Sequence, residues 1–155
     1  TDDDLENLRK KYKFALVTVG QIKSPSLRIK LFNRLKELNY KLPRIISPQS
    51  YISNNSHIGE GTIILHGAII NTNVKVGKNC IVNSKALIEH DSIIGDNCHI
   101  STGAIINGGV KVGDGTFIGS GSITKQSITI GDYCVIKAGI FVNKDIKSKE
   151  KILNN

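Results

Sequence analysis

The sequence predicts a β-solenoid, in which the chain winds into triangular coils of short parallel strands. Two periodicities predict this fold. Every sixth residue from Ile46 to Val142 belongs to one column, and sixteen of its seventeen members are Ile or Val. Glycines that follow this column recur every eighteen residues, at Gly59, Gly77, Gly95, Gly113 and Gly131. Since eighteen is three times six, we expect three six-residue sides per turn and coils stacked about 4.8 Å apart.

A second column, four residues after the first, consists mostly of small residues. Each side of a coil therefore gives one large β-branched residue and one small residue to a narrow core. The three cysteines, Cys80, Cys98 and Cys134, all fall in this second column. We expect them to be buried as free thiols, because buried cysteine behaves as a small apolar residue.

The residues before the repeat predict a small α/β unit. Residues 12–20 read as a buried strand that ends at a glycine. A helix follows Ser24 and Pro25, with leucines on one face and Lys and Arg on the opposite face. The leucines are Leu27, Leu31, Leu35 and Leu38. Residues 42–46 then read as a strand that runs into the first coil.

We therefore expect a mainly β chain in three parts. Residues 1–45 form a partial Rossmann-like β-α-β unit, 46–142 form the solenoid, and 143–155 form a charged C-terminal tail. The chain begins with Thr and contains no Met, so we expect that it lacks an N-terminal part of the protein.

Composition narrows the classes of partner. The net charge of +8 suits a phosphate-bearing small molecule. Nucleic acid is not expected as a partner, because aromatic residues make up only 5% and no helix-turn-helix pattern occurs. No apolar run approaches the roughly 20 residues that span a bilayer, and no signal peptide is recognisable. We expect a cytoplasmic protein without a membrane span.

Across residues 46–142 the repeat resembles the hexapeptide-repeat family, the left-handed parallel β-helix acyltransferases. A small α/β unit followed by such coils resembles a bacterial subgroup of glycan biosynthesis. This subgroup contains the sialic acid O-acetyltransferases and the UDP-4-amino-sugar N-acetyltransferases. The resemblance implies left-handed winding, acetyl-CoA as co-substrate and a trimer with sites between subunits.

Two histidines in IEHDSIIGDNCHIS (residues 88–101) lie nine residues apart, which is half a coil. We name the sides of the coil by one residue each: face A contains Ile94, face B contains Ile100 and face C contains Ile88. His90 then lies at the turn from face C to face A, and His99 points outward from face B. Extended chain of this length separates the two imidazoles by roughly 15 Å within one protomer. On pattern alone, a lone histidine at a surface turn is more often a solvated residue than a catalytic one.

The stretch IEHD...IGD.CHI..GA...GGV.VG resembles the active-site segment of these acetyltransferases. The resemblance implies that His90 is the general base, that Asp91 orients it, and that His99 contacts the acetyl group or the coenzyme. Family members often carry Glu at the position of Asp91. A neutral imidazole suits proton transfer because its ordinary pKa is near 6.5.

Gly108 lies one coil above His90. A glycine there either allows close approach of a ligand, with its N–H holding the thioester oxygen, or is simply a plain turn of the coil. The resemblance implies a coenzyme groove that also passes Asn83, Ala138 and Gly139. Three lysines are candidates for the phosphates of coenzyme A, namely Lys125, Lys137 and Lys144. Each of them is equally explained as a solvated surface residue.

The other two histidines, His57 and His66, are expected to be solvated. The spacings between the four histidines are 9, 24 and 9 residues, so no close pair exists to begin a zinc site. We therefore expect no metal.

Two outward columns are apolar, one on face B and one on face C. Face B shows Ile63, Ile81, His99, Phe117 and Val135, and face C shows Ile69, Leu87, Ile105, Ile123 and Phe141. Exposed together they would favour aggregation. We expect a homotrimer in which face B of one chain packs near face C of the next, so that His90 and His99 of neighbouring subunits share a groove.

The function expected from these observations is acetyl-CoA-dependent acetylation of a bacterial sugar by direct transfer, with His90 as base and the amine of a nucleotide-linked amino sugar as acceptor. O-acetylation of sialic acid is the near alternative. A non-catalytic trimeric β-helix with a structural or binding role is the alternative of another class. An ice-binding solenoid of that class would show regular ranks of Thr, whereas Thr is scattered here.

Overall fold

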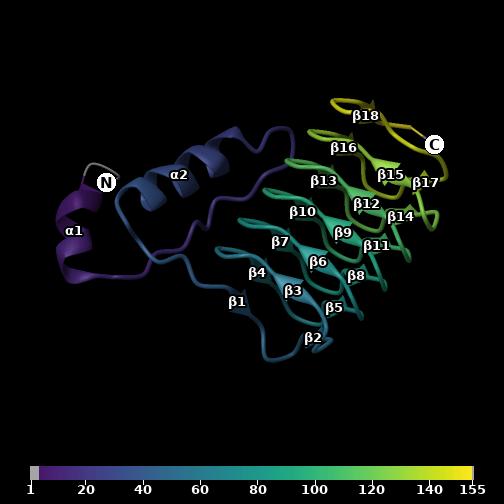
Figure 1. Ribbon diagram of the computed structural model, residues 1–155. Helices are drawn as coiled ribbons and strands as arrows, with labels where there is room; N and C mark the ends of the chain where they lie inside the picture. The colour runs from purple at the N-terminus through teal and green to yellow at the C-terminus, as the bar shows by residue number, and fades with distance from the viewer. Residues whose placement is uncertain (1–3, 155) are drawn as a thin grey trace.

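A computed structural model describes residues 4–154, most of which form a solenoid of parallel two-residue strands (Figure 1). Face B is a seven-stranded sheet of β1 (Ile45–Ile46), β4 (Ile63–Ile64), β7 (Ile81–Val82), β10 (His99–Ile100), β13 (Phe117–Ile118), β16 (Val135–Ile136) and β18 (Lys151–Ile152). Face C is a six-stranded sheet of β2 (Tyr51–Ile52), β5 (Ile69–Ile70), β8 (Leu87–Ile88), β11 (Ile105–Ile106), β14 (Ile123–Thr124) and β17 (Phe141–Val142). Face A is a five-stranded sheet of β3 (His57–Ile58), β6 (Lys75–Val76), β9 (Ile93–Ile94), β12 (Lys111–Val112) and β15 (Thr129–Ile130).

The core follows the two predicted columns. The second residue of most strands points inward, so that Ile64, Ile88 and Ile100 are completely buried. Members of the small column, among them Cys80 and Cys98, fill the corners between the sheets and are also completely buried. All three cysteines are free thiols in this column. The predicted parallel β-helix is therefore confirmed.

Glycine and aspartate stack at the turn from face A to face B. The Asp114 carboxylate accepts a hydrogen bond of 2.7 Å from the backbone N–H of Asp96, one coil below. A Cβ at Gly95 would overlap that carboxylate and lie 3.0 Å from the backbone carbon of Gly113. The eighteen-residue glycine period is thus a packing requirement at one corner of the coil.

The N-terminal unit contains two helices, α1 (Leu5–Lys11) and α2 (Ser26–Glu37). The predicted strand over 12–20 is reduced to one parallel bridge between Phe14 and Lys41. Instead of pairing with a strand, the carbonyls of Val17 and Val19 each accept a hydrogen bond of 2.8 Å from Arg28. The β-α-β unit is therefore incomplete, and β1 belongs to face B of the solenoid.

The buried face of α2 also differs from the predicted one, because it contains Arg28. Arg28 was expected on the polar side of α2, yet it is only 1% exposed, whereas Leu27 is exposed. Its Nε donates to the carbonyl oxygen of Asn79 at 3.0 Å, and Gln21 Nε2 donates to the carbonyl oxygen of Asn97 at 2.8 Å. These contacts attach the N-terminal segment to the solenoid beside β7 and β10, where α2 lies in Figure 1. None of the helices in the described range is long and apolar enough to cross a membrane.

Residues 143–155 were expected as a tail, but those that are described continue the solenoid. Ile146 is buried and bridges to Ile130, and β18 pairs with β16 so that Ile152 lies beside Ile136. In each of these two pairs, the residues lie sixteen positions apart in the sequence instead of eighteen. The shortened last coil breaks the period, which is why the sequence pattern did not reveal it.

We predict that Gly95→Ala lowers the free energy of unfolding by about 1–3 kcal/mol, because its Cβ forces the Asp114 corner apart. Gly20→Ala is the control, since a Cβ there meets no atom within 4 Å. Urea unfolding measures both. Equal stability of the two variants would contradict the packing role of the glycine column.

Candidate active site

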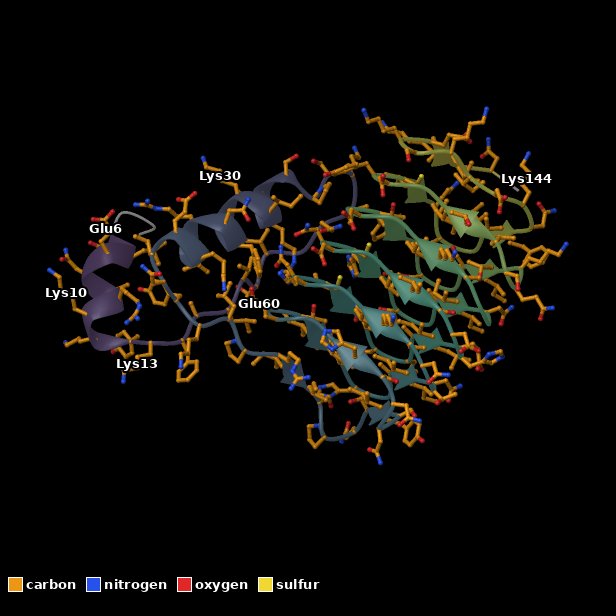
Figure 2. The ribbon with its side chains drawn as sticks, in the orientation of Figure 1. Glu6, Lys10, Lys13, Lys30, Glu60 and Lys144 are labelled. Carbon is orange, nitrogen blue, oxygen red and sulfur yellow. The ribbon has the colours of Figure 1, made fainter. Side chains whose placement is uncertain are left out.

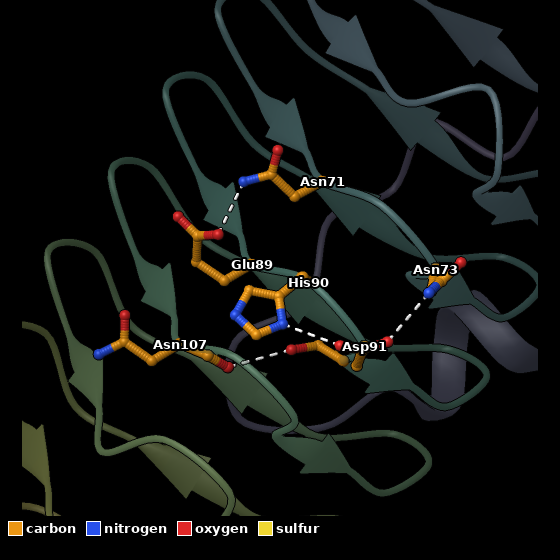
Figure 3. A network of polar contacts seen from close by, with 7 residues as sticks. Asn71, Asn73, Glu89, His90, Asp91 and Asn107 are labelled. Carbon is orange, nitrogen blue, oxygen red and sulfur yellow. Dashed lines mark hydrogen bonds and ion pairs between the residues drawn. The ribbon is translucent and has the colours of Figure 1, made fainter.

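His90 and Asp91 form a hydrogen-bonded pair at the C–A corner, the turn that joins β8 to β9 (Figure 3). His90 Nδ1 lies 2.8 Å from Asp91 Oδ2. Because a carboxylate only accepts, the ring proton is on Nδ1 and Nε2 carries the lone pair. The His90 side chain is 59% exposed, so this lone pair is accessible to a substrate.

The carboxylate of Asp91 is held from both sides. Besides the bond from His90, its Oδ1 accepts a hydrogen bond of 3.1 Å from Asn73 Nδ2, one coil below. These two bonds, that of His90 foremost, lower the pKa of Asp91. The carboxylate therefore stays ionised and fixes the orientation of the imidazole. Asp91 has a backbone φ of 59°, a left-handed conformation that Asp tolerates better than most residues.

Gly108 lies directly against the imidazole of His90, one coil above. A Cβ at Gly108 would come within 2.7 Å of both Cε1 and Nε2 of His90. Any side chain here would displace the ring, so glycine is needed for the observed position of His90. Within residues 4–154 the N–H of Gly108 makes no hydrogen bond, and it is available to a ligand oxygen beside Nε2.

The same corner carries a row of polar side chains one coil apart (Figure 3). Glu89 Oε2 accepts a hydrogen bond of 2.7 Å from Asn71 Nδ2. The carbonyl oxygen of Asn107 accepts one of 3.0 Å from the Ser92 hydroxyl. These bonds connect the coil of His90 to its neighbours on both sides.

His99 lies in a different environment on face B. It is 8% exposed, and its Nδ1 is 2.7 Å from the carbonyl oxygen of Gln21. Since a carbonyl only accepts, Nδ1 carries the proton and Nε2 is left as an acceptor for Asn83 Nδ2 at 3.3 Å. The ring also packs edge-on against Phe117, with centroids 5.2 Å apart. Burial lowers the pKa of His99, so the imidazole is neutral.

Family models match most of the solenoid. The model described as bacterial transferase hexapeptide (six repeats) matches residues 55–90, 73–108 and 91–126, and that of the hexapeptide repeat of succinyl-transferase matches 109–144. The chain belongs to the hexapeptide-repeat transferases. A search among curated proteins found no significant match.

Several solved structures are similar over most of the chain. The acetyltransferase domain of PglB from Neisseria gonorrhoeae is 27% identical with a TM-score of 0.91, covering 97% of this chain and 73% of that one. PerB from Caulobacter crescentus, solved with CoA and GDP-perosamine, is 29% identical with a TM-score of 0.91, covering 95% and 70%. WeeI from Acinetobacter baumannii is 27% identical with a TM-score of 0.82, covering 86% and 66%. These likenesses agree with left-handed winding of the coil.

In this hexapeptide-repeat transferase the predicted site residues fall into two groups. His90, Asp91 and Gly108 meet at the C–A corner. His99 and Asn83 meet at the start of the B–C corner, the turn that joins face B to face C. Ala138 and Gly139 are exposed at that same corner three coils further on, about 14 Å along the solenoid.

Within one chain, face C separates these two groups, and no hydrogen bond joins them in the described range. The three candidate lysines are exposed, and Lys144 projects from the last coils (Figure 2). A single protomer therefore does not assemble all the predicted coenzyme and catalytic residues in one place.

The outward column of face B is covered by the chain itself, which corrects the expected trimer contact. Ile81 and Phe117 are as buried as His99, with the Gln21 segment lying against the column. The column of face C stays open, since Ile69 is 40% and Phe141 56% exposed. Only face C is left as an unpartnered apolar ladder among the described strands. Gln21 carries no sequence signal that could have revealed this cover.

A separate groove lies on face A, with a volume of about 650 Å³. His57, Lys75, Asp96 and Asp114 are among its lining residues. This groove is open to solvent and contains neither His90 nor His99. His66 Nδ1 bonds the Ser47 hydroxyl at 2.7 Å. Residues 4–154 contain no group of three His, Cys, Asp or Glu placed to hold a metal.

We predict that acid destabilises the fold partly through His99. Its pKa is lowered in the folded state, so below about pH 6.5 the unfolded chain takes up a proton that the folded chain rejects, and stability falls with pH. His99→Asn keeps a donor for the Gln21 carbonyl but does not titrate. The loss of unfolding free energy between pH 7.5 and pH 5 should be smaller in this variant. An undiminished loss would contradict the assignment.

Proposed function

We propose that this transferase moves the acetyl group of acetyl-CoA to the amine of an amino sugar carried on a nucleotide. The observation that carries the proposal is the His90–Asp91 pair set against Gly108, which places a base and a backbone donor side by side at an exposed corner. Solved relatives support the substrate class, since PerB was solved with CoA and GDP-perosamine, and the acetyltransferase domain of PglB with acetyl coenzyme A.

His90 acts as the general base. Its Nε2 removes a proton from the amine as the nitrogen attacks the thioester carbonyl, and the C–N bond forms. Asp91 holds the Nδ1 proton throughout and stabilises the imidazolium that results. Gly108 donates its N–H to the carbonyl oxygen as negative charge develops there. The C–S bond then breaks, and the thiolate of coenzyme A takes the proton back from His90.

Transfer is direct, without an acyl-enzyme. All three cysteines are buried in the interior column, so none of them reaches a thioester at the surface. A hydrogen bond with Cys80, together with burial, raises the pKa of Cys98, and burial raises the pKa of Cys134, so both stay unreactive thiols. The nucleophile is therefore the acceptor itself.

We further propose a homotrimer in which the B–C corner of one subunit faces the C–A corner of the next. Two observations support it: the open apolar ladder of face C, and the division of the site residues between two corners of one chain. Asn83, Ala138 and Gly139 of one subunit then line the coenzyme groove opposite His90 of its neighbour. Neutral His99, with Nε2 as acceptor, lies on the coenzyme side.

The test of the proposed activity is thiol release from acetyl-CoA with a panel of acceptors. Nucleotide-linked amino sugars should release coenzyme A and yield an N-acetylated product by mass spectrometry, whereas sialic acid and neutral nucleotide sugars should not. Acetylation of a sugar hydroxyl alone would replace the amine assignment. No transfer to any acceptor would reject the enzyme.

We predict that His90→Ala lowers kcat by about 10²-fold or more while acetyl-CoA binding is nearly unchanged, because the base is lost and the groove is kept. Asp91→Asn should cost less, since the imidazole stays but its orientation and charge are less well supported. His57→Ala, on face A, is the matched control and should keep the wild-type rate. Wild-type turnover of His90→Ala at saturating substrate would rule out this mechanism.

We predict a trimer mass in solution and complementation between inactive chains. If each groove takes His90 from one subunit and His99 from the next, trimers reassembled from inactive His90→Ala and inactive His99→Ala chains should regain activity in the grooves where both histidines are intact. Native mass spectrometry would verify the mixed trimers. Mixed trimers that stay inactive, from variants that are each inactive alone, would reject the shared groove.

A further inference from the structure

Thr124 is the one member of the interior Ile/Val column that is polar. It belongs to β14 on face C and is completely buried. An apolar residue of the same shape, Val, occupies this column elsewhere, for example at Val142 one coil further on. A hydroxyl in this core needs a hydrogen-bond partner, because burying it unpaired costs about 1–3 kcal/mol. The partner that it has is informative.

The backbone ladder of face C is interrupted at Thr124. The other four strand pairs of this sheet are matched at both residues, whereas β11 and β14 are matched only at Ile105 and Ile123. In the regular coils, Glu89 N–H donates to the Ile106 carbonyl at 2.8 Å and Lys125 N–H to the Val142 carbonyl at 2.7 Å. The equivalent N–H of Asn107 does not bond to the Thr124 carbonyl.

Two side chains replace this missing bond. The N–H of Asn107 donates to the Thr124 hydroxyl at 3.0 Å. The carbonyl of Thr124, left without its ladder donor, accepts a hydrogen bond of 2.7 Å from Asn107 Nδ2. Each residue thus supplies a side-chain group in place of its own backbone group. Both are satisfied, so the interruption is a built feature of this coil.

The interruption falls at the C–A corner beside the proposed site. Asn107 directly precedes Gly108, whose backbone lies against His90 and whose N–H we assign to the thioester oxygen. The carbonyl of Asn107 is meanwhile fixed by the Ser92 hydroxyl at 3.0 Å. The peptide that carries the Gly108 N–H therefore begins at a residue held by Thr124 on one side and Ser92 on the other.

We propose that Thr124 and Asn107 are positioning residues that aim the Gly108 N–H at the substrate oxygen. They touch neither substrate nor coenzyme; they act by taking the strand out of the regular ladder one residue before Gly108. This role rests on the proposed acetyl transfer, in which Gly108 stabilises the oxyanion. It also explains why the core has a Thr where a Val would complete the column.

Thr124→Val tests the role, because it keeps the shape and removes the hydroxyl. The N–H of Asn107 then regains the ordinary ladder acceptor, and the Gly108 peptide turns with it. We expect kcat to fall about tenfold, the KM for acetyl-CoA to change less than twofold, and the melting temperature not to fall. Thr124→Ser keeps the hydroxyl and should retain the wild-type kcat.

Val142→Thr is the matched control, because it puts the same hydroxyl in the same column one coil away and should lower stability without changing kcat beyond twofold.

The amide resonance of Gly108, followed by NMR, gives a readout that needs no activity. It should shift in Thr124→Val and stay in place in Thr124→Ser. Wild-type kcat in Thr124→Val, or a Gly108 resonance that does not move, would overturn the proposal. Absence of transfer by the wild type would instead reject the proposed function, and the Gly108 shift would still decide the positioning role.

Discussion

The structure depends on one constraint, the hydrogen-bond ladder that stacks each residue on the residue eighteen positions away. The ladder makes vertical neighbours out of residues that are distant in sequence. Asn73 bonds to Asp91, Asn71 bonds to Glu89, and Gly108 lies against His90, each pair separated by eighteen residues. The candidate active site is therefore built by the same register that builds the core. Its residues need no loop to bring them together, and their positions are as rigid as the coils themselves.

The same register explains where the sequence was informative. The Ile/Val column and the small column fix which side chains point inward, so strands, core and free cysteines were all predictable from the period. The closeness of Gly108 to His90 was predictable for the same reason. The extra coil after residue 142 was not, because Ile146 and Ile152 follow a spacing of sixteen.

Contacts outside the period were out of reach of sequence reasoning. The carbonyl of Gln21 fixes the tautomer of His99 across 78 residues, and a backbone carbonyl leaves no trace in the side-chain pattern. Arg28 was assigned to a solvated helix face because arginine is rarely buried. In the structure its guanidinium donates hydrogen bonds to the carbonyls of Val17 and Val19, which would otherwise bond to a neighbouring strand. Thr124 was visible as an exception to the column, but only the broken ladder shows what it replaces.

The central claim is that catalysis takes place at the C–A corner, between Gly108 and His90, and not in the groove of face A. A crystal structure of the protein with coenzyme A bound tests it most directly. We expect the thiol sulfur to lie within contact of His90 Nε2 and the Gly108 N–H, with the pantetheine arm along the B–C corner of a neighbouring subunit. Coenzyme A bound along face A, against His57, Lys75 and Asp96, would contradict it.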